Sequence, residues 1–240
     1  TADWGDVQPN DDFGCDMNDL SDPAIDVYDN AMFIIALDYL LEMAPDSPQA
    51  SRWKSLREGI ERNVRAHLWD EKRQKFIPHI YPEKSPIPEG FDELAIHYHG
   101  GTAIAIEAGL LSKDEIRTVN AQMLENVRLS GMPSIGLTLY PVYPDGFFHG
   151  GMSKAYLYQN GGDWTWFGGR MIQQLVVNGM VEEAYAEIHP MIERVIQNDG
   201  FYEWYGKGGV PSGSGNFKGS AGVLSKAIEL LRDWAEKNKS

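Results

Sequence analysis

Apolar side chains recur at helical spacing along most of this chain and mark out seven helices. In residues 22–43 they are so dense that little of the helix surface can face water, which indicates a buried helix. In residues 47–69 a narrow apolar stripe alternates with Arg, Lys and Glu, which is typical of a helix with one solvent-facing side. The other five helices are expected at residues 102–111, 112–128, 164–177, 181–197 and 220–237.

Local start and stop signals support these boundaries. Pro23 suits the first position of a helix, where its missing N–H is not needed. Ser112 and Glu115 have the spacing of a capping box. Gly179, directly after Asn178, is a helix stop.

The order of these elements repeats. A buried helix, a short turn, an amphipathic helix and a long loop rich in Gly and aromatic residues occur three times, and a seventh helix follows. Stacked helical hairpins of this kind form toroids or solenoids, with long loops on one face that carry the binding site. The sequence therefore predicts an all-α fold, an α/α toroid of helical hairpins, as a single domain over residues 1–240.

Composition and charge limit the classes of molecule that this chain is expected to bind. The chain has 240 residues, 42% hydrophobic and 23% charged, as in ordinary globular proteins. Its net charge of −14 argues against nucleic acid and against anionic membrane surfaces. No run approaches the ~20 apolar residues that a membrane helix needs. We expect neither nucleic acid nor a membrane as partner.

Cysteine usage and the start of the chain leave the compartment open. Cys15 is alone, so no internal disulfide is possible. No signal peptide is visible, and the chain does not begin with Met, so we expect a processed, trimmed or partial N-terminus. The acidic residues of the first loop do not have the spacing of a calcium loop. We expect no metal and no cofactor.

The stretch 158–169 carries the strongest signal for a ligand. Gln159 and Asn160 offer hydrogen-bond donors and acceptors, while Trp164 and Trp166 offer flat apolar faces. A sugar, with hydroxyls on its edges and C–H groups on its faces, matches that set. The alternatives are core packing for the tryptophans and capping of the following helix for the amides.

Two further groups are candidates for the same site. Glu203 stands among four aromatic residues, where an unpartnered carboxylate is costly, so it is a candidate catalytic group or a member of a structural network. Trp204, next to it, either stacks on a sugar or packs in the core. His97 and His99 share a face if the chain is extended there. With no further ligand at a known spacing we expect them to line the pocket rather than to bind metal.

Three motifs resemble the six-hairpin glycosidases, the (α/α)6-barrel clan that includes amylo-α-1,6-glucosidases, processing α-glucosidases and cellobiose phosphorylases. Trp4-Gly5-Asp6, followed by the helix at 24–33, is similar to the stretch that holds the general acid. Residues 158–164 are similar to the sugar-binding loop. Residues 201–205 with 217–222 resemble the segment that holds the general base. The order of the motifs is more specific than any one of them.

The resemblance implies an inverting, exo-acting hydrolase of oligosaccharides. Asp6 is then the general acid and Glu203 the general base, with their carboxyls roughly 6.5–9.5 Å apart. Asp3 is the second choice of acid, and Asp3 and Trp4 are expected to contact substrate. One alternative is an inverting phosphorylase, in which phosphate replaces the activated water, although Glu203 argues against it. The other is a non-catalytic carbohydrate-binding fragment.

The resemblance also exposes a shortfall. The complete barrel has six hairpins, whereas this sequence supplies three and a seventh helix. The fold expected is therefore a partial (α/α)6 barrel that lacks its N-terminal hairpins. Because such a barrel leaves the flanks of its inner helices uncovered, we expect self-association or association with the missing hairpins.

Overall fold

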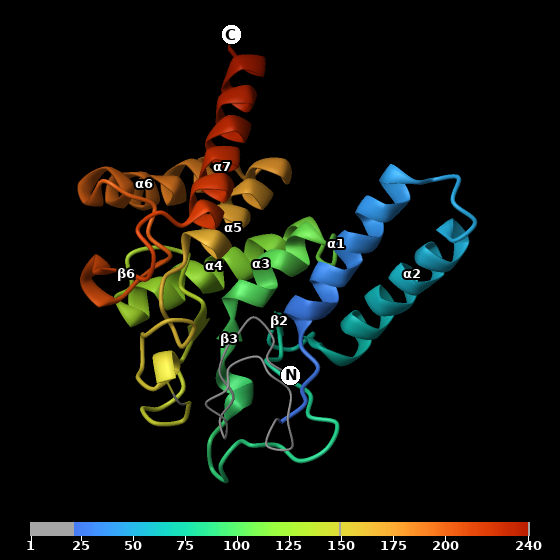
Figure 1. Ribbon diagram of the computed structural model, residues 1–240, viewed down its shortest axis with the longest axis horizontal. Helices are drawn as coiled ribbons and strands as arrows, with labels where there is room; N and C mark the ends of the chain where they lie inside the picture. Colours follow the sequence, from blue (N-terminus) through green and yellow to red (C-terminus); the bar gives the residue numbers. More distant parts are fainter. Residues whose placement is uncertain (1–21, 149, 240) are drawn as a thin grey trace.

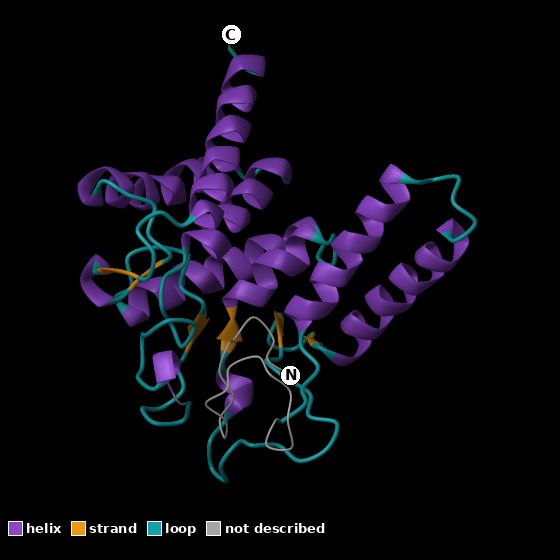
Figure 2. Cartoon of the chain, in the orientation of Figure 1, coloured by secondary structure: helices purple, strands orange, loops and turns teal. Residues whose placement is uncertain are grey.

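The structure is a computed structural model that describes residues 22–148 and 150–239, and helices dominate it (Figures 1 and 2). The seven helices expected from the sequence are present in this part of the chain. They are α1 (Val27–Met43), α2 (Ala50–His67), α3 (His99–Glu107), α4 (Lys113–Ser130), α5 (Thr165–Val177), α6 (Val181–Asn198) and α7 (Lys218–Lys237).

Helices α1, α3, α5 and α7 form a row in which each packs against the next (Figure 1). Helix α2 packs on α1, and α6 packs on α5 and α7, so that these amphipathic helices lie outside the row. Burial follows this arrangement, because α3 buries eight of its nine residues whereas α2 buries only Val64. The all-α toroid of hairpins is confirmed. The burial expected of the first helix is wrong, because α1 lies at the open end of the row and buries only four of its 17 residues.

Short antiparallel strand pairs lie in the segments between the helices (Figure 2). In each pair the strands contribute two residues, so the pairs serve to hold loops rather than to form a sheet layer. The pairs are β1 (Trp69–Asp70) with β2 (Lys75–Phe76), β3 (His97–Tyr98) with β4 (Leu139–Tyr140), and β5 (Trp204–Tyr205) with β6 (Pro211–Ser212).

Two predicted helix starts are wrong, and backbone pairing with a distant segment lies directly before each observed start. Helix α1 begins at Val27 rather than at 22, since the backbone of Ile25 pairs with that of Ile80 and Asp26 then caps the helix. Helix α3 begins at His99 rather than at 102. Residues 97–98 form β3, and the helix starts directly behind that strand.

Other ends shift by two or three residues. Ser47 and Pro48 lie in a turn, and α2 begins at Ala50. Helix α7 begins at Lys218 rather than at 220. The capping box of α4 is confirmed, because the Glu115 carboxylate accepts a hydrogen bond from the Ser112 backbone N–H at 2.8 Å.

Both ends of the row expose apolar side chains. At the α1 end Phe33, Tyr39 and Met43 are 48%, 56% and 74% exposed. At the α7 end Ile228 and Trp234 are 44% and 45% exposed. None of the described helices is both long enough and apolar enough to cross a membrane. The row is thus an open arc with two apolar edges.

Candidate functional site

One pocket, of about 240 Å³, lies where the inner helices begin. Tyr28 is in the first turn of α1, Trp164 precedes the first residue of α5, and Phe217 precedes the first residue of α7. The full lining is Tyr28, Tyr158, Gln159, Trp164, Trp166, Phe167, Glu203 and Phe217. The fold therefore brings together segments near residues 28, 160, 203 and 217 that are far apart in the chain.

Aromatic rings form most of the wall of this pocket. Trp164 contacts Tyr158 edge to face, with ring centroids 5.0 Å apart, and Phe217 at 6.2 Å. Its indole Nε1–H donates to the Tyr158 carbonyl at 3.1 Å, which fixes the ring. Trp166 carries the Arg170 guanidinium on one face at 4.3 Å. The rings are held by contacts with one another and with Arg170, which does not line the pocket, as a preorganised binding site requires.

Glu203 contributes the carboxylate of the pocket. Its backbone N–H donates to the Ser214 carbonyl at 2.9 Å, and its Oε2 accepts from the Ser214 N–H at 3.2 Å. These two bonds, with the β5–β6 pairing, fix the direction of the side chain. Four of the candidates chosen from the sequence thus line one pocket, namely Gln159, Trp164, Trp166 and Glu203.

A buried ion pair lies behind the pocket, and sequence reasoning missed it. Asp163 has no exposed surface, and its Oδ1 is 2.8 Å from Nη1 of Arg194 on α6. The Ser134 hydroxyl lies 2.7 Å from Oδ2, and Arg194 Nη2 donates to Thr165 Oγ1 at 2.6 Å. The Arg194 guanidinium also stacks on Tyr205, 4.0 Å from the ring centroid.

Beside this ion pair, two backbone hydrogen bonds join the two segments that supply the pocket. The Asp163 N–H donates to the Tyr205 carbonyl at 2.9 Å, and the Tyr205 N–H donates back to the Asp163 carbonyl at 2.8 Å. A sequence signal existed, because Arg194 falls on the buried stripe of α6, three residues after Met191. A charge on an apolar stripe needs a buried partner.

Four other candidates lie outside the pocket lining, namely Asn160, Trp204, His97 and His99. Asn160 is fully buried, and its amide bonds the Tyr143 N–H at 2.9 Å and the Tyr143 carbonyl at 3.1 Å. It therefore holds a loop and does not cap α5. Trp204 packs edge to face on Tyr158, with centroids 6.2 Å apart.

The two histidines occupy a separate buried cluster. His97 belongs to β3, and His99 opens α3 with 4% of its surface exposed. Asn126 Nδ2 lies 3.0 Å from His99 Nε2, so that Nε2 accepts the hydrogen bond. Burial lowers the pKa of His97 to about 4 and that of His99 to about 3, with nearby Lys75 adding to both shifts. Both rings are thus neutral at neutral pH, and neither lines the pocket.

Asp3, Trp4 and Asp6 lie outside the described residues, and their roles stay predictions. Among the described residues no group of three or more His, Cys, Asp or Glu side chains could hold a metal ion. The residues that the structure places in the pocket offer one carboxylate, one amide and six aromatic rings.

Solved structures share this architecture. The chain is 19% identical to GH63 mannosylglycerate hydrolase from Thermus thermophilus bound to Tris and D-glycerate, with a TM-score of 0.58. The glucose complex of that hydrolase is 16% identical, with a TM-score of 0.55. An uncharacterized conserved protein of the same organism is also 16% identical, with a TM-score of 0.60. This chain has the fold of the six-hairpin glycosidases.

The six-hairpin fold is present only in part. Each of these matches covers 88% of this chain but only 46–48% of the neighbour, so the chain spans about half the neighbours' length. No protein-family model matches the sequence. No curated protein matches it either. The predicted partial (α/α)6 barrel is confirmed at the level of the fold.

Proposed function

We propose that the chain is part of a glycoside hydrolase and that its pocket holds one sugar ring of an oligosaccharide. The observation that carries this proposal is that Glu203 lines the same pocket as Trp164, Trp166 and Gln159. Aromatic faces match the C–H groups of a sugar, and the carboxylate and amide match its hydroxyls. The fold shared with a glycosidase supports the same assignment.

In the proposed reaction Glu203 acts as general base. It takes a proton from a water molecule whose oxygen attacks the anomeric carbon, while the bond from that carbon to the leaving oxygen breaks. The leaving oxygen takes its proton from Asp6, the proposed general acid. The products are a free sugar of inverted anomeric configuration and the shortened oligosaccharide.

The first test replaces the base. We expect Glu203→Gln to lower kcat at least ~100-fold, because removal of a general base typically costs 10²–10⁴ in rate, while sugar binding is retained. Substrates to screen are mannosylglycerate, after which the neighbouring hydrolase is named, and a panel of chromogenic glycosides. The matched control is Glu89→Gln, at an exposed loop position. Full activity in Glu203→Gln contradicts the proposal.

The same assay separates hydrolysis from phosphorolysis. Sugar release without phosphate, with the inverted anomer seen by NMR at early times, supports the hydrolase. Release of a sugar 1-phosphate, and only when phosphate is present, supports the phosphorylase alternative instead.

A second candidate is a carbohydrate-binding fragment without catalysis. The chain spans about half the length of its neighbours, and this favours a piece that keeps the pocket and lacks part of the machinery. Calorimetry then shows sugar binding that Glu203→Gln leaves unchanged, with no turnover of any glycoside. Trp166→Ala is expected to weaken that binding about 2- to 12-fold, because an aromatic stacking contact contributes about 0.5–1.5 kcal/mol.

A further inference from the structure

The buried carboxylate of Glu93 connects side chains from two other segments of the chain. Glu93 begins the short 3₁₀ helix Glu93–Ala95 and is 9% exposed. Its Oε1 accepts the hydroxyls of Tyr81 and Tyr143 at 2.9 and 2.7 Å, and His79 Nδ1 lies 2.8 Å from the same oxygen. Burial of a carboxylate is costly unless donors replace the water that it loses, and hydrogen bonds to an ionised acceptor are strong.

Tyr143 links this carboxylate to the loop of the sugar pocket. It is 2% exposed, and its ring stacks on Phe91 and Phe147 with centroids 5.5 and 4.8 Å apart. The Asn160 side chain bonds the Tyr143 backbone twice, because Oδ1 accepts from the N–H at 2.9 Å and Nδ2 donates to the carbonyl at 3.1 Å. The position of Tyr143 therefore sets the position of Asn160.

Gln159 lies directly before Asn160 and lines the sugar pocket. Thr138, which has no exposed surface, holds the same turn. Its Oγ1 donates to the Gln159 carbonyl at 2.8 Å and accepts from the Gly161 N–H at 3.1 Å. The backbone around Gln159 is thus held both by Thr138 and, through Asn160, by Tyr143.

We propose that Glu93 is a positioning residue for the sugar pocket. It holds Tyr143, which through Asn160 places the Gln159 amide for hydrogen bonding to a sugar hydroxyl. The inference rests on the proposed function, which assigns a sugar contact to Gln159. Neither Glu93 nor Tyr143 is among the residues that line the pocket, so both act through the loop. A binding group that is displaced by about 1 Å loses much of the benefit of preorganisation.

Tyr143→Phe is the smallest change that tests this inference, because it removes only the hydroxyl that Glu93 accepts. The titrations use mannosylglycerate or, where it does not bind, the glycoside of the panel that binds most tightly. We expect the dissociation constant to rise about 3- to 10-fold. In an active chain KM should rise likewise while kcat stays within about twofold, since Ser214 holds Glu203 independently. A merely structural role would instead lower kcat through loss of folded enzyme and leave KM unchanged.

Further variants test the acceptor and the route separately. Glu93→Gln retains an acceptor oxygen and should bind the glycoside more tightly than Glu93→Leu, which retains none. In a Gln159→Ala background Tyr143→Phe should change the dissociation constant less than ~2-fold, because the group that it displaces is already absent. An effect of equal size with and without Gln159 overturns the proposed route.

A measurement without ligand makes the test independent of sugar binding. The side-chain amide cross-peak of Gln159 in ¹H–¹⁵N NMR spectra, identified by its loss in Gln159→Ala, should shift in Tyr143→Phe. The matched control is Ser112→Ala, which removes the cap of α4 and so destabilises the chain at a position away from this loop. The control should leave the cross-peak and the dissociation constant unchanged.

The two proposals fail in different ways. A wild-type chain that binds no glycoside contradicts the proposed function, and the Gln159 cross-peak then still decides the role of Glu93. An unmoved cross-peak in Tyr143→Phe overturns that role. So does an unchanged dissociation constant in Tyr143→Phe when the wild type binds the glycoside.

Discussion

Glu203 owes its direction to a glycine ten residues later in the chain. Gly213 has φ of +69°, and a Cβ at that position would collide with the Glu203 carboxylate. A side chain there is strained by the backbone and would also displace the carboxylate. The orientation of the proposed base is therefore a property of the turn that faces it.

His99 makes folding stability depend on pH. Burial, with the nearby charges of His97 and Lys75, lowers its pKa to about 3, whereas an unperturbed histidine titrates at 6.5. Below pH 6.5 the unfolded chain binds a proton that the folded chain refuses, so stability falls as pH drops toward 3. At pH 4.5, two pH units below the ordinary histidine pKa, this residue lowers the free energy of unfolding by about 3 kcal/mol.

Urea unfolding at pH 7 and pH 4.5 checks this prediction. The wild type should lose about 2–3 kcal/mol more than His99→Gln between the two pH values, because the variant lacks the titrating ring. The control is His67→Gln at an exposed site, which should lose as much as the wild type. Equal losses in the wild type and His99→Gln would show that His99 carries none of the effect.

At the scale of elements, the loop before α5 and the β5 segment act as one unit. Asp163 and Tyr205 exchange two backbone hydrogen bonds, and Arg194 of α6 neutralises Asp163 from behind. This arrangement holds Glu203 beside Trp164, although about forty residues separate them in the chain. The pocket therefore depends on a side chain that does not line it.

Arg194→Met tests this dependence. It leaves the Asp163 charge buried without its partner, and loss of one member of a buried pair typically costs about 3–5 kcal/mol of unfolding free energy. The exposed pair partner Arg117→Met should cost no more than about 0.5 kcal/mol. Both values come from urea unfolding followed by circular dichroism.

The double variant Arg194→Met with Asp163→Asn separates the charge from the packing. It should recover part of the lost stability, because no unpaired charge remains. A loss below about 1 kcal/mol in Arg194→Met contradicts the assignment, since a buried charge would then have been left unpaired almost without penalty.

On the scale of the whole molecule, stability is expected to vary along the row. Helix α5 buries eight of its thirteen residues between α3 and α7, whereas α2 buries one and packs mainly on α1 at the open edge. Local opening is easiest where few apolar side chains are buried. Native-state hydrogen exchange should therefore give lower opening free energies for α2 than for α5. Equal protection in the two helices would contradict this gradient.

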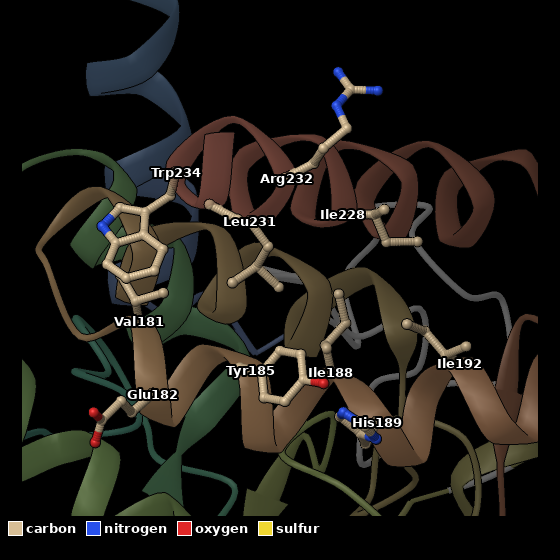
Figure 3. A pocket seen from close by; sticks show the side chains of 11 residues that line it. Val181, Glu182, Tyr185, Ile188, His189, Ile192, Ile228, Leu231, Arg232 and Trp234 are labelled. Atoms are coloured by element: carbon tan, nitrogen blue, oxygen red, sulfur yellow. The ribbon is translucent and has the colours of Figure 1, made fainter. Parts of the chain in front are cut away.

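The open edges bear on function as well as on stability. A toroid that spans about half of its neighbours' length keeps the face where α1, α5 and α7 begin, and this face holds the pocket. Helices α6 and α7 meanwhile expose a separate apolar groove, which is lined by Tyr185 and Trp234 among others (Figure 3). The pocket and the groove use different residues, so a groove variant should leave sugar binding unchanged.

The sequence by itself determined the helices and their inner and outer roles. The spacing of apolar residues at helical intervals involves neighbours three and four positions apart. It can therefore be recognised without knowledge of any distant contact. Two local clusters singled out the pocket residues, namely the amide and tryptophans of 158–169, which include Gln159, Trp164 and Trp166, and the aromatic residues around Glu203.

Tertiary structure alone decided which members of each cluster reach the pocket. Asn160 and Trp204 stand next to pocket residues in the chain, yet loop pairing turns them toward the protein. The first turn predicted for α1 gave way to backbone pairing with a distant residue, and α3 begins three residues earlier than predicted, directly behind β3. The ion pair of Asp163 and Arg194 forms across segments whose contact depends on packing of α5 against α6. These outcomes depend on which distant segments pack against each other. A local sequence pattern contains no information about such long-range contacts.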